Sequence, residues 1–178
     1  GLLRPIVSGE PGERISIDVT GPHVRSRTGK IYILTIMDQF TKYVEAIPMP
    51  NQEAKTVANA LINTWMVRFG IPLQILTDQG TNFESNLFQE LCQLLKIDKV
   101  RTSPYSPRTN GMIERFHKTM NSLLGKVVAD NQKDWCERLP QVLAAYRATV
   151  HESTGYSPNF LTFGKEVYGV SDLMLGRP

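Results

Sequence analysis

Three acidic residues stand where a carboxylate needs a particular reason to be. Asp18 lies inside the stretch "SIDVTG" between Ile17 and Val19, and a charge within a strand is unfavourable unless it reaches water or has a function. Asp78 ends the apolar stretch "QILTD" before a Gly turn, and Glu114 follows a loop that contains Pro and Gly. Carboxylates gathered from separate elements are typical ligands of a hard divalent cation such as Mg²⁺. Two such ions about 3.5–4 Å apart could activate a nucleophile and stabilise the leaving oxygen of an in-line phosphoryl displacement.

Each acid also has a structural interpretation when it is considered alone. Asp78 before Gly80 is a common turn residue, and the edge of a sheet could solvate Asp18. Glu114 is predicted to lie in the first turn of a helix, where the helix dipole favours an acid by ~0.3–1 kcal/mol. The metal-site hypothesis therefore rests on the three acids together, in a sequence that offers no Ser/His/Asp or Cys/His arrangement.

A basic segment surrounds Glu114. Residues 99–118 carry five cations against that single acid: Lys99, Arg101, Arg108, Arg115 and Lys118. Such a patch suits a phosphodiester partner, and a solvated basic face is an equal alternative. The net charge of +3 on 178 residues is compatible with a polyanion but does not select one. Because no apolar run approaches the ~18–20 residues of a membrane span, no membrane partner is expected.

The two cysteines, Cys92 and Cys136, stand at apolar positions of helical patterns. We therefore expect two buried free thiols rather than a disulfide. The histidines do not pair with them at zinc-finger spacing, so no structural zinc site is expected.

The hydrophobic pattern predicts a single α/β domain. Apolar and alternating segments predict strands, the first three as an antiparallel meander, at 14–22, 30–40, 42–49, 71–80 and 98–103. Helical spacing predicts helices at 51–70, 84–97, 111–129 and 133–150, with a short one within 153–167. We expect Pro140 to interrupt the last long helix. This order implies a mixed five-stranded sheet with helices on both faces, which is the order of the RNase H-like fold.

Three motifs resemble those of retroviral integrases and of gypsy-type LTR-retrotransposon integrases with their domesticated vertebrate relatives. They are "IDVTGP", "TDQGTNF" and "TSPYSPRTNGMIERFHKTM", and 35 residues separate Asp78 from Glu114, as in the D-D-35-E arrangement of that family. The segment "STGYSPNFLTFGKE" resembles the one that follows the family's core. The resemblance covers about residues 5–168.

The resemblance implies a catalytic core that binds two Mg²⁺ or Mn²⁺ ions through Asp18, Asp78 and Glu114. Asp18 and Asp78 would share one ion, and Asp18 and Glu114 would hold the other. Members of the family trim the 3′ ends of their element's DNA with water and then join those ends to target DNA by transesterification. No side-chain base is needed, because the metal lowers the pKa of the attacking group.

The resemblance also implies DNA contacts around Glu114. Residues 103–111 would be the family's flexible active-site loop, with Arg108 where many relatives have Gln and Ser106 where they often have His or Asn. On the helix that follows, His117 and Lys118 share the face of Glu114. The expected DNA contacts are Arg108, Thr109, Asn110, Arg115, His117 and Lys118.

Residues 1–12 are expected to be a linker from an N-terminal domain, 13–150 the catalytic core and 151–178 a C-terminal extension of an excised core. The resemblance further implies a homodimer of cores through the helices at 54–69 and 141–150, with a higher multimer in the full-length protein. It also implies host tethering factors, and action in the nucleus after a cytoplasmic nucleoprotein complex.

Two alternatives remain open. A ribonuclease H or a cut-and-paste transposase could use the same fold, although "TDQGTNF" and the spacing of the acids argue against a ribonuclease H. A domesticated integrase-like domain could keep the fold as a nucleic-acid- or protein-binding module without catalysis. The three intact acids argue against that loss, since only chemistry requires all of them.

Overall fold

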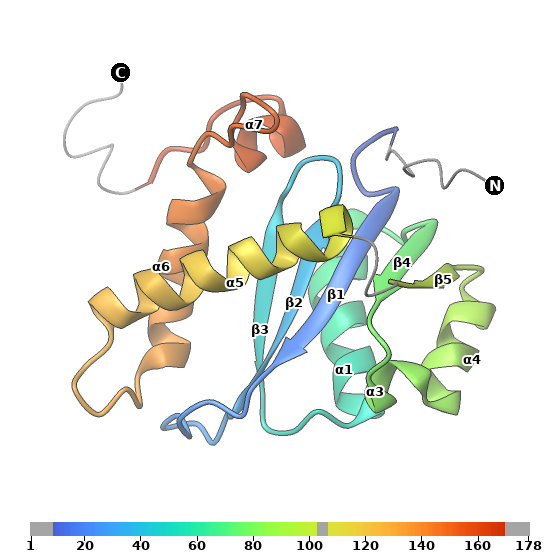
Figure 1. Cartoon of the computed structure of the whole chain (residues 1–178), viewed down its shortest axis with the longest axis horizontal. Coiled ribbons are helices and arrows are strands. Elements are labelled where there is room, and N and C mark those ends of the chain that lie inside the picture. The colour runs from blue at the N-terminus through green and yellow to red at the C-terminus, as the bar shows by residue number, and fades with distance from the viewer. Residues whose placement is uncertain (1–8, 103–106, 170–178) are drawn as a thin grey trace.

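A mixed five-stranded sheet forms the centre of the computed structural model, which describes residues 9–102 and 107–169, with the side chains of 107–110 excepted. The strand order is β3-β2-β1-β4-β5 (Figure 1). The first three strands are antiparallel and β4 and β5 run parallel to β1, which confirms the predicted meander and mixed sheet. Their bounds are β1 Arg14–Thr20, β2 Tyr32–Asp38, β3 Val44–Met49, β4 Gln74–Thr77 and β5 Asp98–Arg101.

The helices cover both faces of this sheet, as predicted. They are α1 Ala54–Ala60, the π-helical η1 Leu61–Met66, α2 Val67–Phe69, α3 Thr81–Glu84, α4 Asn86–Leu94, α5 Pro107–Val127, α6 Trp135–Arg147 and α7 Pro158–Phe163. In Figure 1, α5 crosses the sheet on the side of α6, and α1, α3 and α4 lie behind it. No helix in the described part of the chain is long and apolar enough to cross a membrane.

Alternation along the strands creates two hydrophobic cores. Leu34 and Ile36 of β2 belong to the core under α1 and α4, while Ile33 and Met37 belong to the core under α5 and α6. On β1, Ile15 and Ile17 pack into the first core. Because successive strand residues face opposite sides, Asp18 is directed to the α5 side.

The helix that carries Glu114 begins earlier than predicted. α5 starts at Pro107 rather than at residue 111, so residues 107–111 of the predicted loop are helical and Glu114 lies well inside the helix. Pro suits a first helical turn because its missing N–H would have no intrahelical partner there. Burial of Phe116, Met120 and Leu124 favours the helix by more than the ~1 kcal/mol that a Gly within it costs. The helix-terminus interpretation of Glu114 is therefore wrong.

The predicted interruption at Pro140 is also wrong. α6 runs through this exposed residue as one helix, held to the sheet by the buried Leu139, Val142 and Leu143. The predicted helix at 84–97 instead divides at Ser85, whose hydroxyl accepts from the Phe88 N–H as the cap of α4.

The short helix predicted within 153–167 is present as α7. Phe163 packs edge-on against Tyr43, with 5.9 Å between ring centroids, so this segment contacts the body of the domain. Both cysteines are free, as predicted, but only Cys92 is buried and Cys136 is half-buried.

Candidate active site

The parallel pairing of β1 and β4 brings the first two acids together. Ser16 pairs with Leu76, so continuing that register by two residues places Asp78 beside Asp18. Asp78 follows directly on the end of β4, and its Oδ1 accepts a 2.9 Å hydrogen bond from the Gly80 N–H. Asp78 is therefore both the turn residue and the site residue that the sequence predicts.

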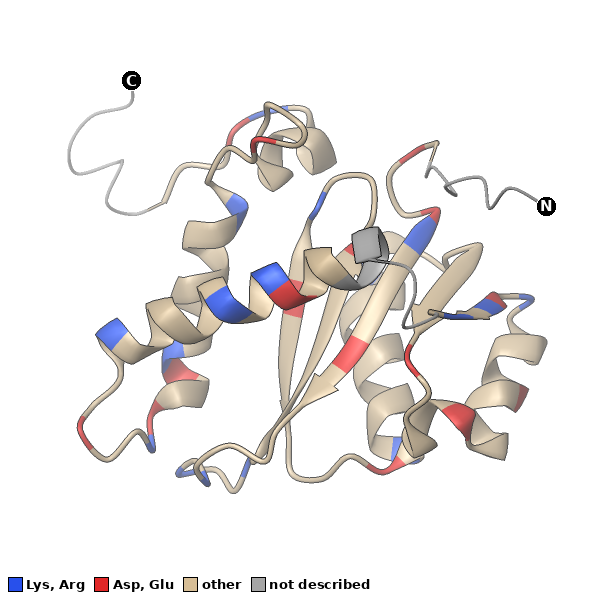
Figure 2. Ribbon diagram, viewed as in Figure 1, with Lys and Arg blue, Asp and Glu red and all other residues tan. Residues whose placement is uncertain are grey.

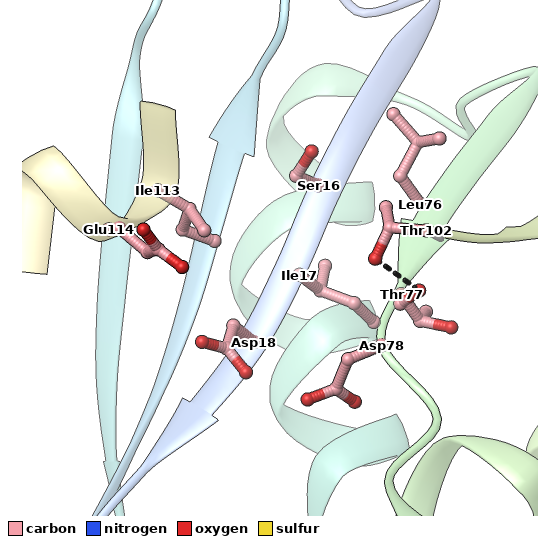
Figure 3. Close-up of a pocket in the computed structure, with 9 residues that line it drawn as sticks. All are labelled: Ser16, Ile17, Asp18, Leu76, Thr77, Asp78, Thr102, Ile113 and Glu114. Atoms are coloured by element: carbon pink, nitrogen blue, oxygen red, sulfur yellow. Dashed lines mark hydrogen bonds between the residues drawn. The ribbon is translucent and has the colours of Figure 1, made fainter. Parts of the chain in front are cut away.

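Glu114 completes the cluster from α5. A cavity of about 160 Å³ is lined by Asp18, Asp78 and Glu114 together with Ser16, Ile17, Leu76, Thr77, Thr102 and Ile113 (Figure 3). The three predicted acids, which lie 60 and 36 positions apart in sequence, thus line one pocket. Sheet pairing aligns the two aspartates, and the packing of α5 across the sheet brings Glu114 to them.

The environment of Asp18 makes its negative charge unfavourable. Burial, with the neighbouring charges of Asp78 and Glu114, raises the pKa of Asp18 from 3.8 to about 6, and the Val19 N–H hydrogen bond opposes that rise. Two like charges around a partly desolvated carboxylate are a feature of sites that bind a cation or exchange a proton.

His117 lies beside Asp18, on the face of α5 predicted for it. Its Nδ1 is 3.8 Å from Asp18 Oδ2, and its Nε2 is 3.1 Å from the Thr35 hydroxyl, which belongs to the residue paired with Asp18 across the sheet. Burial lowers the pKa of His117 and so favours the neutral form of the ring. These contacts suit the tautomer of His117 in which Nε2 accepts from the Thr35 hydroxyl and the Nδ1–H is directed at Asp18. Thr35 had no signal in the sequence apart from strand alternation.

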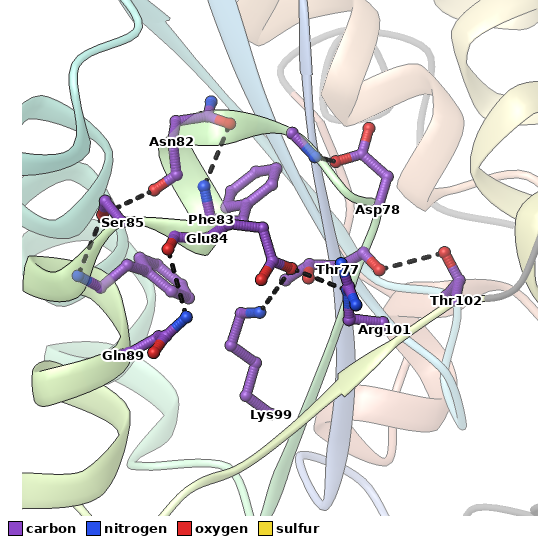
Figure 4. Close-up of polar contacts among 12 residues, drawn as sticks. Thr77, Asp78, Asn82, Phe83, Glu84, Ser85, Gln89, Lys99, Arg101 and Thr102 are labelled. Atoms are coloured by element: carbon purple, nitrogen blue, oxygen red, sulfur yellow. Dashed lines mark hydrogen bonds and ion pairs between the residues drawn. The ribbon is translucent and has the colours of Figure 1, made fainter.

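The segments that follow β4 and β5 are joined to each other. The Thr77 carbonyl accepts from both the N–H and the hydroxyl of Thr102, at 2.7 and 3.1 Å. Glu84 Oε1 lies 3.1 Å from Lys99 Nζ and 3.1 Å from Arg101 Nε (Figure 4). Asp78 therefore lies between Thr77, which is hydrogen-bonded to Thr102, and α3, whose Glu84 is paired with β5. Because Lys99 and Arg101 are paired within the chain, the predicted basic patch has two fewer cations for an external partner.

A side chain at Gly80 would crowd the turn after Asp78. A Cβ on this residue would lie 2.7 Å from Asn82 Oδ1 and 3.0 Å from Asp78 Oδ1. A side chain would therefore require the Asn82 amide to move and would press on the Asp78 carboxylate.

The predicted DNA-contacting residues are divided between two faces of α5. His117 faces Asp18, and Lys118 is exposed four residues after Glu114. Arg115 instead lines a groove between α5 and α6. The side chains of Arg108, Thr109 and Asn110, and the whole of Ser106, lie outside the described residues.

The pocket has the donor chemistry of a magnesium site without a preformed metal cage. Within residues 9–102 and 107–169, no three His, Cys, Asp or Glu side chains form a group that could hold an ion as they stand. The pocket nonetheless combines three carboxylates with a buried Thr77 hydroxyl that lacks a hydrogen-bond partner among the described residues. Oxygen donors of this kind fit Mg²⁺ or Mn²⁺, and a cation would relieve the repulsion at Asp18.

Residues 9–107 match the integrase core domain family. The chain belongs to this family. It is 31% identical over 153 residues to a retrovirus-related Pol polyprotein from transposon 412 of Drosophila melanogaster, over 86% of this chain and 12% of that protein. It is 32% identical over 164 residues to a Gag-Pol polyprotein of avian reticuloendotheliosis virus, over 92% of this chain and 14% of that protein. The integrase core thus spans about one eighth of the length of these relatives.

The fold matches that of solved integrase cores. The HTLV-2 integrase catalytic core domain, in complex with magnesium and in a trimeric form, superposes with a TM-score of 0.71 at 22% identity, over 87% of this chain and 99% of that one. The same domain in a dimeric form gives a TM-score of 0.65 at 21% identity, over 86% and 97% of the two chains. The predicted RNase H-like fold is therefore confirmed.

Proposed function

We propose that this integrase core is the catalytic part of an enzyme that trims the 3′ ends of its element's DNA and joins them to target DNA. The observation that carries the proposal is the convergence of Asp18, Asp78 and Glu114 on one pocket, with the Asp18 pKa raised by burial and by the other two acids. In each step an oxygen, first of water and then of the new 3′-hydroxyl, bonds to phosphorus as a P–O3′ bond breaks. The attacking oxygen loses its proton, and the leaving O3′ takes one up.

Two divalent cations fit this pocket by donor chemistry. Asp18 and Asp78 would hold one Mg²⁺ or Mn²⁺, and Asp18 and Glu114 the second, as the resemblance implies. When bound, such ions supply a more acidic attacking hydroxyl and stabilise charge on the leaving oxygen. The solved HTLV-2 core is a complex with magnesium, which supports the proposal.

The surrounding residues orient the acids. The Val19 N–H holds one oxygen of Asp18, and the Gly80 N–H holds one oxygen of Asp78. His117, which contacts Thr35, lies 3.8 Å from the other oxygen of Asp18. Lys118 is proposed to contact DNA phosphate from the exposed face of α5, and Arg108, Thr109 and Asn110 from the segment before Glu114.

The assembly and location of the protein are also proposals. We infer a homodimer of cores, which the dimeric form of the solved HTLV-2 core supports, through the faces of α1–α2 and α6. Action on DNA implies the nucleus, after a cytoplasmic nucleoprotein complex, and host tethering factors are compatible with it.

The test is Mg²⁺- or Mn²⁺-dependent joining and disintegration of short DNA by the purified chain. Asp78→Asn is expected to lower the rate by at least ~100-fold while DNA affinity persists, because metal stabilisation of the transition state is worth several kcal/mol. Asp130→Asn, the same change at an exposed acid outside the pocket, is the matched control and should retain the rate. If wild type and Asp78→Asn bind DNA equally and neither cleaves nor joins it, the non-catalytic binding module replaces this proposal.

A further inference from the structure

A histidine stands beside the acidic pocket without belonging to its set of carboxylates. His117 lies on α5 one turn after Glu114, and its side chain is only 14% exposed. Figure 2 shows the acidic segments of β1 and α5, which hold Asp18 and Glu114, close together where α5 crosses the sheet. The Nδ1 atom of His117 is 3.8 Å from Asp18 Oδ2. A ring nitrogen therefore lies beside the carboxylate that is proposed to contact both metal ions.

The ring is near enough to Asp18 for both side chains to bind one metal ion. Bonds from zinc to nitrogen and to oxygen are about 2.0–2.2 Å long, so two ligand atoms of one tetrahedral ion lie about 3.4 Å apart. The 3.8 Å between Nδ1 and Oδ2 exceeds that separation by only ~0.4 Å. Imidazole is a preferred ligand of Zn²⁺ and Ni²⁺, whereas Mg²⁺ is bound by oxygens. A free imidazole at this position would therefore shift the selectivity of the pocket away from Mg²⁺.

Thr35 engages the other nitrogen of the ring. Its hydroxyl lies 3.1 Å from His117 Nε2, and Thr35 is paired with Asp18 across the sheet. Thr35 is fully buried, and this contact is the one hydrogen bond of its hydroxyl among the described residues. A buried hydroxyl needs an acceptor for its proton, and the Nε2 lone pair is the acceptor at hydrogen-bond distance. The hydroxyl therefore donates to Nε2, and the proton of the neutral ring lies on Nδ1.

In this tautomer neither nitrogen of His117 is available to a metal ion. The Nε2 lone pair accepts from Thr35, and Nδ1 carries a hydrogen directed at Asp18. We propose that Thr35 determines the metal selectivity of the pocket by holding His117 in the tautomer that cannot act as a ligand. The donors are then oxygens alone, so Zn²⁺, Co²⁺ and Ni²⁺ gain no bond to imidazole over Mg²⁺ or Mn²⁺. This inference rests on the proposed function in one respect, which is that the pocket binds divalent cations.

The tautomer can be measured on the wild-type chain without any metal. Long-range ¹H–¹⁵N spectra of the histidine rings, recorded in EDTA at pH 7.5, should show His117 protonated at Nδ1. His117→Asn identifies the signals of this ring by their loss. A wild-type His117 that carries its proton on Nε2 would overturn the proposal, and this measurement does not depend on how well any Thr35 variant folds.

The selectivity is measured with Co²⁺ as the probe, because its visible absorption is stronger in a tetrahedral site with a nitrogen ligand than in a site of six oxygens. Thr35→Val keeps the shape of the side chain and removes the hydroxyl, so the ring can turn a lone pair to the ion. Co²⁺ affinity should rise ~10-fold and the absorption should intensify, while Mg²⁺ affinity, measured by competition, should change by less than ~2-fold. Thr35→Ser keeps the hydroxyl and should bind both ions as the wild type does.

A second Thr–His pair provides the matched control. The Thr20 hydroxyl lies 3.0 Å from His23 Nε2, but among the described residues His23 forms no ion pair with a carboxylate, and it does not line the acidic pocket. Thr20→Val should therefore leave Co²⁺ affinity unchanged, and adding His117→Ala to Thr35→Val should abolish the gain. An unchanged Co²⁺ affinity in Thr35→Val, an equal gain in Thr20→Val, or a gain that survives His117→Ala would each contradict the proposal.

The outcomes also separate this inference from the proposed function. A wild type that binds Mg²⁺ and Co²⁺ through oxygens alone but does not join DNA would remove the proposed activity and leave the role of Thr35. A wild type that joins DNA while its Co²⁺ spectrum shows a nitrogen ligand would do the reverse. Absence of divalent-cation binding by the wild type would overturn both.

Discussion

Asp18 and Glu84 are two carboxylates whose side chains are equally exposed and whose pKa values are shifted in opposite directions. Each side chain is 27% exposed, and burial alone would raise the pKa of both. At Glu84 the hydrogen bond from Lys99 outweighs burial, and the charges of Lys99 and Arg101 add to it, so the pKa is lowered. At Asp18 burial is reinforced by Asp78 and Glu114, and the pKa rises to about 6.

The difference shows which acid is structural. Glu84 has its counter-charge within the chain and fastens the helix after β4 to β5. Asp18 has carboxylates as neighbours, and the native fold holds it there at a cost to stability. An acid whose charge the protein leaves uncompensated is a candidate for binding a cation. Removing each carboxylate in turn should therefore change stability in opposite directions, and only the loss of Asp18 should abolish activity.

The largest effect is expected on activity at Asp18. Asp18→Asn keeps the shape of the side chain but removes the charge proposed to be shared by both metal ions. Metal-dependent joining of short DNA should fall by at least ~100-fold, measured with Mn²⁺ and with Mg²⁺. Glu84→Gln, the matched loss of one carboxylate, should keep most of the activity. Comparable losses of activity in the two variants would contradict the distinction between Asp18 as a metal ligand and Glu84 as a structural acid.

The next effect is a gain in stability from the same substitution. Without divalent cations at pH 7.5, Asp18→Asn should raise the free energy of unfolding by about 1–3 kcal/mol. Because the folded pKa of about 6 exceeds the unfolded value of 3.8, the wild type loses stability as pH rises from about 4 to 6. The advantage of the variant should therefore be complete above about pH 7 and vanish near pH 4. Urea unfolding in EDTA at several pH values measures it, and a gain that does not depend on pH would show that repulsion at Asp18 is not its source.

Much of the architecture could be predicted from the sequence because it depends on local periodicity. The strands of the meander, the final short helix and the acids at 18, 78 and 114 were all recognisable from apolar alternation and motif spacing. The start of α5 was not, because Asn110-Gly111 is ordinarily a turn signal and only packing against the sheet makes that segment helical. The continuity of α6 through Pro140 depends on tertiary packing in the same way.

The sequence could not predict which side chains on separate elements pair with one another. The sequence places Lys99 and Arg101 in a basic patch that suits either a phosphate partner or solvent, but in the fold Glu84, 15 residues before Lys99, pairs with both. Thr35 and His117 are brought together only by strand register and helix packing. Local patterns identify which residues carry charge, and the fold decides which of those charges remain free.

The smallest effect is expected at Glu84. Glu84→Gln weakens the link to Lys99 and Arg101, so the melting temperature should fall slightly at pH 7, and less in high salt because Arg101 is more than half exposed. Because the pKa of Glu84 is lowered in the folded state, its stabilising contribution is fully present at pH values above 4.5, the unfolded pKa. The contribution should disappear as the wild-type carboxylate protonates below that pH. Scanning calorimetry across pH measures the difference in melting temperature between each variant and the wild type. This difference should be negative for Glu84→Gln and positive for Asp18→Asn, and both should approach zero in acid. A stabilising Glu84→Gln would mean that desolvation outweighs the ion pairs at Glu84, and burial rather than the sign of the neighbouring charges would then govern the pKa of both acids.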